Sequence, residues 1–356
     1  MSNSPQVITI GNLSEFCVGA LRHCGVGEAD SRVTAQILAT TDAWGVFTHG
    51  TKALRGYLRR LRGGGLAARG VPSVVTEGPG WAVVDGHSSL GMVTSTYAMD
   101  LALGKARQTG LGYVGVRNSC HFGAAGAYAA QAARSGFIGL AMANDIPSVA
   151  APGSRGAVTG SNPLAYAVPA GRHQPLMLDM SIATVAGGKV YAARERGEPI
   201  PATWLIDEQG RPTDDPQAYP EHSTLTPAAG HKGFGLALLI ETLAGALTGA
   251  AMTTQVGSWL AGDASAATHH GAAFLAMDVA AISPDLPVRI ESLIDEIHAA
   301  PRAEEAGRLY VPGEKEWENL DRSLRDGITL PPDVMSSLRE AAVIGDMDLD
   351  RYLKPL

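Results

Sequence analysis

The chain has few cysteines, few aromatic residues and no excess of positive charge. Its 356 residues include 3 cysteines, and its 28 lysines and arginines are outnumbered by 35 aspartates and glutamates. The net charge of −7 argues against a nucleic-acid-binding protein, because no surplus of cations is available to neutralise phosphates. Cys17, Cys24 and Cys120 are too sparse for a disulfide framework, which fits a reducing compartment.

Long hydrophobic runs and targeting signals are also missing. No uncharged apolar run reaches the roughly 18 residues that a membrane-spanning helix needs. The first residues lack a cationic segment followed by an apolar one, so no signal peptide is predicted. We therefore expect a cytoplasmic protein that binds neither membrane nor nucleic acid. The composition, 45% hydrophobic and 18% charged, is that of folded globular domains.

Metal-ligand spacings and the GxSxG nucleophile motif are absent from the sequence as well, so no metal site is predicted. His269 and His270 lie in a polar, glycine-rich stretch, residues 254–272, which is expected to form a mobile loop with both histidines exposed. Cys120 has neighbours that suit burial, and we interpret it as a packed residue rather than a nucleophile.

The order of apolar patterns predicts an α/β fold in three regions. Residues 1–70 read as an N-terminal helical region, because apolar residues recur at helical spacing up to the three glycines at 63–65. Residues 71–315 alternate short apolar strands with helices and form the main α/β domain. Residues 316–356 are amphipathic and are expected to form a C-terminal helical segment that packs back on the N-terminal region.

One glycine motif has the letters of a dinucleotide-binding motif but not its surroundings. Residues 110–115 spell GLGYVG, a literal GxGxxG. The dinucleotide-binding version of this motif needs a strand before it and a helix that begins within it. Here the pattern predicts a helix before it and a strand after it, so we interpret it as a helix-to-strand turn. A Rossmann domain is therefore not predicted.

Two histidines stand beside candidate helix starts. Thr48-His49-Gly50 precedes a helix, and Lys52 lies three residues after His49, so both side chains can face the same way. His49 could then act as a base on a substrate whose carboxylate is bound by Lys52. The alternative is a capping threonine before a solvated basic face. His121 follows a strand and precedes a helix of small residues, where either a ligand or a structural cap fits.

Further polar clusters lie at the ends of apolar strands, where either ligand binding or ordinary turn formation explains them. One more cluster contains a lysine, Lys232, in the glycine-rich turn before an apolar helix. Such a lysine can bind an anion, and by itself it leaves open an anion-binding module that uses no nicotinamide. These clusters are Asn144-Asp145, Ser161-Asn162-Pro163, Asp179-Met180-Ser181, Lys232-Gly233 and Pro312-Gly313-Glu314.

Taken together and in order, seven motifs resemble one family over nearly the whole chain: the malate/L-lactate dehydrogenases of the second type, which include ureidoglycolate, sulfolactate, diketogulonate and piperideine-carboxylate oxidoreductases. Each motif alone is weak, and their shared order is specific. The motifs are GVFTHGTKALRGYLRRLRGGG (45–65), VDGHSSLG (84–91), RNSCHFGAAGAYA (117–129), GSNPLAYAVP (160–169), LDMSIATVAGGKV (178–190), GHKGFGLALLIETLAGALTGA (230–250) and VPGEKEWEN (311–319).

The resemblance implies a homodimeric oxidoreductase that uses NAD or NADP, held by a non-Rossmann sheet domain, and that interconverts a small 2-hydroxy acid and its 2-oxo acid. His121, or else His49, would be the acid/base. A 2-imino acid reductase, or a relative that binds cofactor without this activity, is the alternative. The expected substrate contacts are Thr48, Lys52, Asn144 and Asp145. The expected cofactor contacts are His121, Asn162, Asp179, Met180, Ser181, Lys232, Gly233, Pro312, Gly313 and Glu314.

Two departures from the family pattern bear on these expectations. The family usually has an arginine four residues after the first histidine, where this chain has Ala53; Lys52 is our candidate replacement for binding the substrate carboxylate, and Arg55 is less well aligned. A lysine is a point charge rather than a two-pronged donor, so substrate preference is expected to differ. The hydroxyl expected at Ala183 is also missing, and one appears at Ser181.

Overall fold

The computed structural model describes residues 6–353, and it has the predicted α/β architecture. Its centre is a seven-stranded sheet in which β3 and β4 form the one parallel pair among the described residues, all other neighbours being antiparallel. A Rossmann sheet is parallel with helical crossovers, so the non-Rossmann prediction is confirmed. In spatial order the strands are β2 (Ser73–Gly78), β3 (Trp81–Asp85), β4 (Leu111–Ser119), β13 (His270–Asp278), β5 (Phe137–Ala143), β8 (Leu164–Val168) and β9 (Leu176–Met180).

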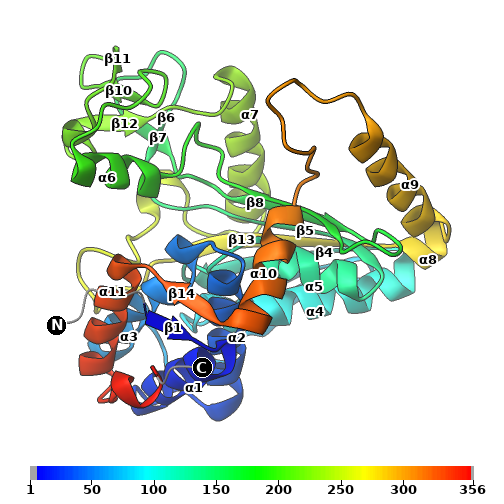
Figure 1. Cartoon of the computed structure of the whole chain (residues 1–356). Helices are drawn as coiled ribbons and strands as arrows, with labels where there is room; N and C mark the ends of the chain where they lie inside the picture. Colours follow the sequence, from blue (N-terminus) through cyan, green and yellow to red (C-terminus); the bar gives the residue numbers. More distant parts are fainter. Residues whose placement is uncertain (1–5, 354–356) are drawn as a thin grey trace.

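Helices cover this sheet on both faces (Figure 1). α4 (Gly91–Thr109) and α5 (Gly126–Arg134) lie on one face, and their alanines pack closely against the strands. Gly110, at φ 84°, ends α4 in the left-handed conformation just before β4 begins, so GLGYVG is the predicted helix-to-strand turn. On the other face, α7 (His231–Ile240) runs into a π-helical turn (Glu241–Ala246) instead of forming one long helix.

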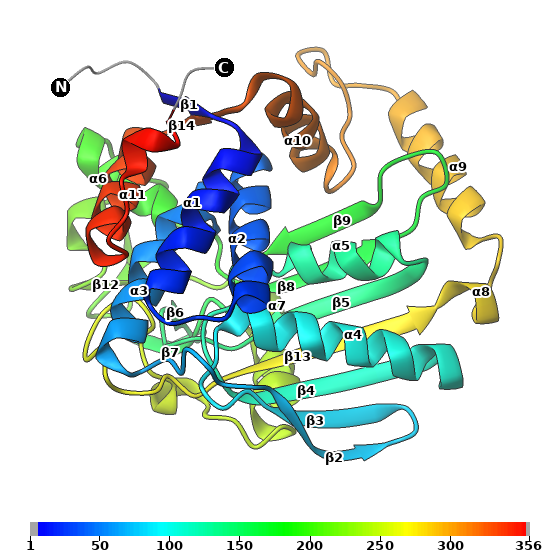
Figure 2. The same cartoon turned by 90° about the horizontal axis from the view of Figure 1, so that it is seen from below.

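Elements from the N-terminal and C-terminal parts of the described chain pack together beside the sheet (Figure 2). β1 (Gln6–Ile8) pairs antiparallel with β14 (Ile328–Leu330), and α11 (Pro332–Ile344) packs on α3 (Leu54–Gly63) over a shared apolar core. The boundaries 70/71 and 315/316 stay a prediction. The remaining elements of this part are α1 (Ile10–His23), α2 (Glu28–Ala43), the 3-10 turns Phe47–His49 and Thr51–Ala53, α10 (Glu314–Asp326) and the 3-10 turn Leu349–Arg351.

A smaller five-stranded sheet with its own apolar core lies apart from the central sheet, near α6 (Gly187–Arg196) in Figure 1. It consists of β11 (Pro212–Thr213), β10 (Leu205–Asp207), β12 (Ser223–Leu225), β6 (Val149–Ala150) and β7 (Ala157–Thr159). The other elements are the 3-10 turns Pro216–Ala218 and Thr253–Gln255, α8 (Val279–Ile282) and α9 (Leu286–Ala299).

Two sequence expectations about element bounds need correction. The helix expected directly after Thr48-His49-Gly50 begins only at Leu54, because Gly50 interrupts the helical backbone and the Thr51 N–H donates to the buried carboxylate of Asp42. The loop expected over residues 254–272 ends earlier, because β13 begins at His270. Both corrections move a histidine: His49 lies on a 3-10 turn, and His270 lies in the sheet.

Within residues 6–353, no helix is both long enough and apolar enough to cross a bilayer.

Candidate active site

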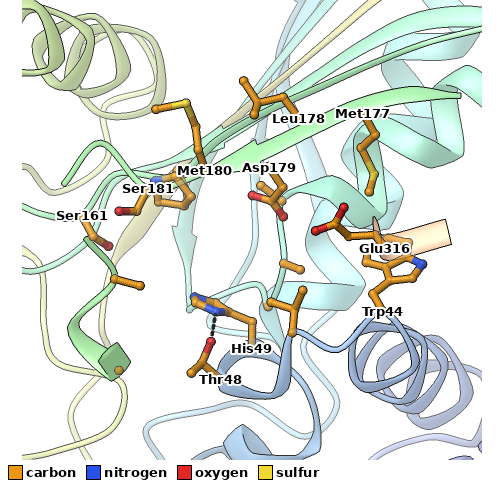
Figure 3. A pocket seen from close by; sticks show the side chains of 18 of the residues that line it. Trp44, Thr48, His49, Ser161, Met177, Leu178, Asp179, Met180, Ser181 and Glu316 are labelled. Carbon is orange, nitrogen blue, oxygen red and sulfur yellow. Dashed lines mark hydrogen bonds between the residues drawn. The ribbon is translucent and has the colours of Figure 1, made fainter. Parts of the chain in front are cut away.

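A cavity of about 570 Å³ lies where the helical region, the ends of the central strands and the 310–316 segment come together (Figure 3). Ligand and cofactor pockets are typically about 300–1,000 Å³, so this one can take a large organic ligand. Most of the predicted site residues line it: Thr48, His49, His121, Asn144, Asp145, Asp179, Met180, Ser181, Pro312 and Gly313.

The two predicted histidines converge in this cavity although they are far apart along the chain. Their ring centroids are 5.5 Å apart and their planes differ by 28°. The Thr48 hydroxyl lies 2.9 Å from His49 Nδ1, and the Tyr57 hydroxyl lies 2.6 Å from His121 Nδ1. Each imidazole is therefore held by a hydroxyl at its Nδ1.

Burial makes both imidazoles neutral in the free protein. The pKa of His121 is lowered from 6.5 to about 3 by burial, and the nearby charge of His49 adds to the effect. Burial also lowers the pKa of His49. The pKa of the Tyr57 hydroxyl is raised well above its usual value by burial, so it stays protonated. A neutral hydroxyl both donates and accepts, and Tyr57 can bond to His121 Nδ1 in either protonation state of the ring.

A third histidine, His270, belongs to the same cavity, which corrects the expectation that it is exposed. His270 opens β13 and is only 2% exposed, and its Nε2 lies 3.1 Å from a carboxylate oxygen of Asp145. Burial acts to raise the pKa of Asp145, but the hydrogen bond and charge of His270 outweigh it and hold that pKa below its usual value. Asp145 is thus an ionised carboxylate beside three imidazoles.

Asn162 holds the backbone of Asp145 in place, and the side chain of the preceding residue, Asn144, is fixed separately. The Asn162 side-chain oxygen accepts from the Asp145 backbone N–H at 3.2 Å, and the Asn162 amide donates to the buried carboxylate of Glu241 at 3.1 Å. The Asn144 amide donates to the backbone carbonyl of Ala251 at 2.7 Å. Asn162 supports Asp145 and is not among the residues that line the cavity, so its cofactor contact stays a prediction.

The opposite end of the cavity carries two carboxylates, Asp179 and Glu316, which point toward one another in Figure 3. The Asp179 carboxylate accepts the Gly126 backbone N–H at 2.7 Å. Burial raises the pKa of Asp179 to about 6, and the negative charge of Glu316 adds to this. Nearby, α6 begins at Gly187 and Gly188 with no capping side chain, and both glycines line the cavity. Uncapped N–H groups at a helix N-terminus suit a phosphate.

These features fit a dinucleotide. Carboxylates suit ribose hydroxyls, an uncapped helix start suits a pyrophosphate, and a cavity with imidazoles at one end suits a reacting ring.

Comparisons with known proteins show which family the chain belongs to. The sequence profile of the malate/L-lactate dehydrogenase family matches residues 8–339. The chain belongs to the malate/L-lactate dehydrogenase family. It is 33% identical over 339 residues to a malate dehydrogenase of Pyrococcus abyssi, covering 93% of this chain and 92% of that protein. It is 31% identical to the NAD(+) ureidoglycolate dehydrogenase of Escherichia coli K12, covering 92% and 93%.

A solved structure gives the same result for the fold. The sulfolactate dehydrogenase from Methanocaldococcus jannaschii superimposes with a TM-score of 0.90 at 31% identity, covering 98% of this chain and all of that chain. The resemblance inferred from the seven motifs is thereby confirmed.

Some predicted residues of this family member lie elsewhere. Lys52 does not line the cavity, because its ammonium forms an ion pair with Asp333 of α11 at 2.6 Å. The Glu314 carboxylate turns away to accept the Val311 N–H at 2.9 Å and to contact His298. Lys232 and Gly233 lie in the first turn of α7 and are not among the residues that line this cavity, so their cofactor contact stays a prediction.

Three residues of the site were not predicted from sequence: Tyr57, His270 and Glu316. Tyr57 lies on α3, and its position opposite His121 depends on how α3 packs against the residues after β4. The only sequence signal for His270 is that an apolar strand follows it. Cys120 is buried beside His121, and burial raises the pKa of its thiol to about 11. An un-ionised thiol is a poor nucleophile, which supports the packing interpretation.

Proposed function

We propose that this protein is an NAD- or NADP-dependent oxidoreductase that interconverts a small 2-hydroxy acid and its 2-oxo acid. The observation that carries the proposal is the convergence of His49 and His121 in one cavity that also fits a dinucleotide. The named activities of its relatives, on malate, ureidoglycolate and sulfolactate, support the same substrate class.

In this proposal, Asp179, the start of α6 and the turn at Pro312-Gly313 hold the cofactor, whose nicotinamide supplies or accepts a hydride. His121 handles the proton. When a 2-hydroxy acid is oxidised, His121 Nε2 takes the hydroxyl proton while Nδ1 keeps its hydrogen bond with the Tyr57 hydroxyl. When a 2-oxo acid is reduced, the same nitrogen returns the proton. Neutral His121 in the free protein is ready for the first of these steps.

The substrate carboxylate needs a partner in the absence of Lys52. Among the described residues that line the cavity, Lys315 is the one lysine or arginine, and its ammonium lies over the Tyr310 ring. We assign the carboxylate to Thr48 and His49, which lie together at the histidine end. A carboxylate there favours protonation of His49, because an adjacent opposite charge stabilises the imidazolium.

The experiment that tests the proposal combines a panel of substrates with two histidine variants. NADH and NADPH oxidation is followed with a panel of 2-oxo acids and one cyclic 2-imino acid, for the wild type, His121→Ala and His49→Ala. We expect turnover of a 2-oxo acid and a loss of about 10²–10⁴ in kcat for His121→Ala, with cofactor affinity retained. Wild-type kcat in His121→Ala refutes the assignment of His121. Turnover of the imine alone favours the imino acid reductase.

We also propose that the protein is a homodimer. Large apolar side chains on α7 and the turn after it are each more than one third exposed, which is unusual for a monomer surface when they are contiguous. These are Leu236, Leu238, Leu239 and Leu247.

A further inference from the structure

The segment from Val256 to Thr268, which we call the docked loop, joins the turn Thr253–Gln255 to β13. The sequence predicts it to be mobile, yet a buried arginine holds it. Arg60 of α3 is 4% exposed, and its guanidinium donates to the carbonyls of Trp259 at 2.8 Å and Ala266 at 2.7 Å, and also to those of Ser258 and Ala261. A guanidinium has five N–H donors, so most of them are committed to this backbone.

The glycines at the end of α3 allow the backbone of the docked loop to lie close to this helix. The Gly65 N–H donates to the Ala264 carbonyl at 2.9 Å. A Cβ atom on Gly65 would lie 2.5 Å from that carbonyl oxygen and 2.6 Å from the carbonyl oxygen of Ala266. A Cβ atom on Gly63 would likewise lie 2.8 Å from Ala264, whereas Gly64, at φ 92°, has open space and only ends the helix. Gly63 and Gly65 therefore let the loop backbone pack directly against the end of α3.

The docked loop delivers one large side chain to the site. The Trp259 indole is stacked on the His121 ring, with centroids 4.0 Å apart and planes 16° apart. It is also stacked near the Tyr57 ring, at 5.5 Å and 22°. Trp259 is not among the residues that line the cavity, so it reaches the reacting atoms only through His121.

We propose that Trp259 is a positioning residue for His121. The Tyr57 hydroxyl fixes one atom of the ring, Nδ1, and leaves rotation about that contact open. The flat contact with the indole fixes the plane of the ring and keeps water from its covered face. A general base must be held within about 0.5 Å and 10–20° of its productive geometry, and a 1 Å misplacement can cost about 10²-fold in rate. Arg60 and Gly65 act indirectly, because they hold the docked loop that carries Trp259.

This inference rests on the proposed function for its kinetic readout, so the test also includes a readout that does not. The informative pair is Trp259→Phe, which keeps a flat ring, and Trp259→Leu, which keeps apolar bulk without one. The matched control is Trp81→Phe, an exposed tryptophan on β3. Circular dichroism and NADH affinity report whether the fold and the cofactor site are intact.

The expected kinetic result is a fall in kcat of about 10- to 100-fold for Trp259→Leu and less than about 3-fold for Trp259→Phe and Trp81→Phe. The independent readout is an NMR titration of 15N-labelled histidines without cofactor or substrate. Water at the uncovered ring of Trp259→Leu should raise the pKa of His121 by at least one unit, a tenfold change in its proton affinity. The groups that face His121, which are His49, Tyr57, Asp145 and His270, are unchanged in every variant.

The possible results distinguish a failure of the positioning role from a failure of the proposed function. If Trp259→Leu keeps the wild-type kcat and the wild-type His121 titration, Trp259 does not position His121. If the titration shifts as expected but no variant and no wild type turns over any 2-oxo acid, the positioning role stands and the proposed function fails. If Trp259→Leu does not fold, Arg60→Lys and Gly65→Ala test the docking of the loop by the same two readouts, and an unchanged titration in both overturns the inference.

Discussion

Because His121 is half-buried and neutral, its titration allows a quantitative prediction about acid stability. The pKa of His121 is about 3 in the folded protein against 6.5 for an ordinary histidine. Below pH 6.5 the unfolded chain binds a proton at His121 that the folded chain does not bind, so the free energy of unfolding falls as the pH falls toward 3. At pH 4.5 the difference is about two pKa units, or about 2.7 kcal/mol at 1.36 kcal/mol per unit.

The assay compares the wild type with His121→Gln, which carries no titrating group at this position. Urea unfolding is followed by tryptophan fluorescence at pH 7.5 and pH 4.5, at one protein concentration because association would also contribute. The wild type should lose about 2.7 kcal/mol more than the variant between the two pH values. The exposed His231→Gln on α7 serves as the control and should behave as the wild type. Equal losses in the wild type and His121→Gln would show that His121 is not held neutral by burial.

Two further predictions concern charged neighbours of the site. His270→Asn should destabilise the protein by about 1–3 kcal/mol in urea unfolding, because it leaves the Asp145 carboxylate, which is 20% exposed, without its imidazole partner; a loss below about 0.5 kcal/mol would mean that this contact contributes little to stability. Lys52→Met should leave KM for the 2-oxo acid within about 3-fold of the wild type in steady-state assays, because the ammonium is committed to Asp333 at the surface and such pairs contribute little. A tenfold rise in KM would place Lys52 in the substrate site after all.

The sequence correctly predicted the features that depend on neighbours along the chain. Apolar periodicity and glycine stops predicted most helices and strands, and the strand after GLGYVG excluded a Rossmann motif. The strand ends also placed Asp145 and Asp179 at the cavity. These predictions succeed because backbone conformation and burial follow from local residue spacing.

Predictions that needed a partner distant in sequence were less reliable. Lys52 was assigned to the substrate because of its spacing from His49, but α11, almost three hundred residues later, supplies the carboxylate that binds it. His270 was expected to be exposed because its neighbours are polar and glycine-rich, but its pairing with β4 and its contact with Asp145 bury it. Charge pairing depends on which surfaces meet, and no local pattern records that.

Short motifs in a set order along the chain suffice for the family, the α/β order of elements and the presence of two histidines at one site. The protonation state and orientation of those histidines depend on how distant segments fold together. Tertiary packing placed the Tyr57 hydroxyl at Nδ1 of His121, brought Trp259 onto the ring, and put Asp145 and His270 nearby. The physical reason is that the pKa and orientation of an imidazole depend on burial and on contacts within a few ångströms in space, which packing of distant segments alone creates.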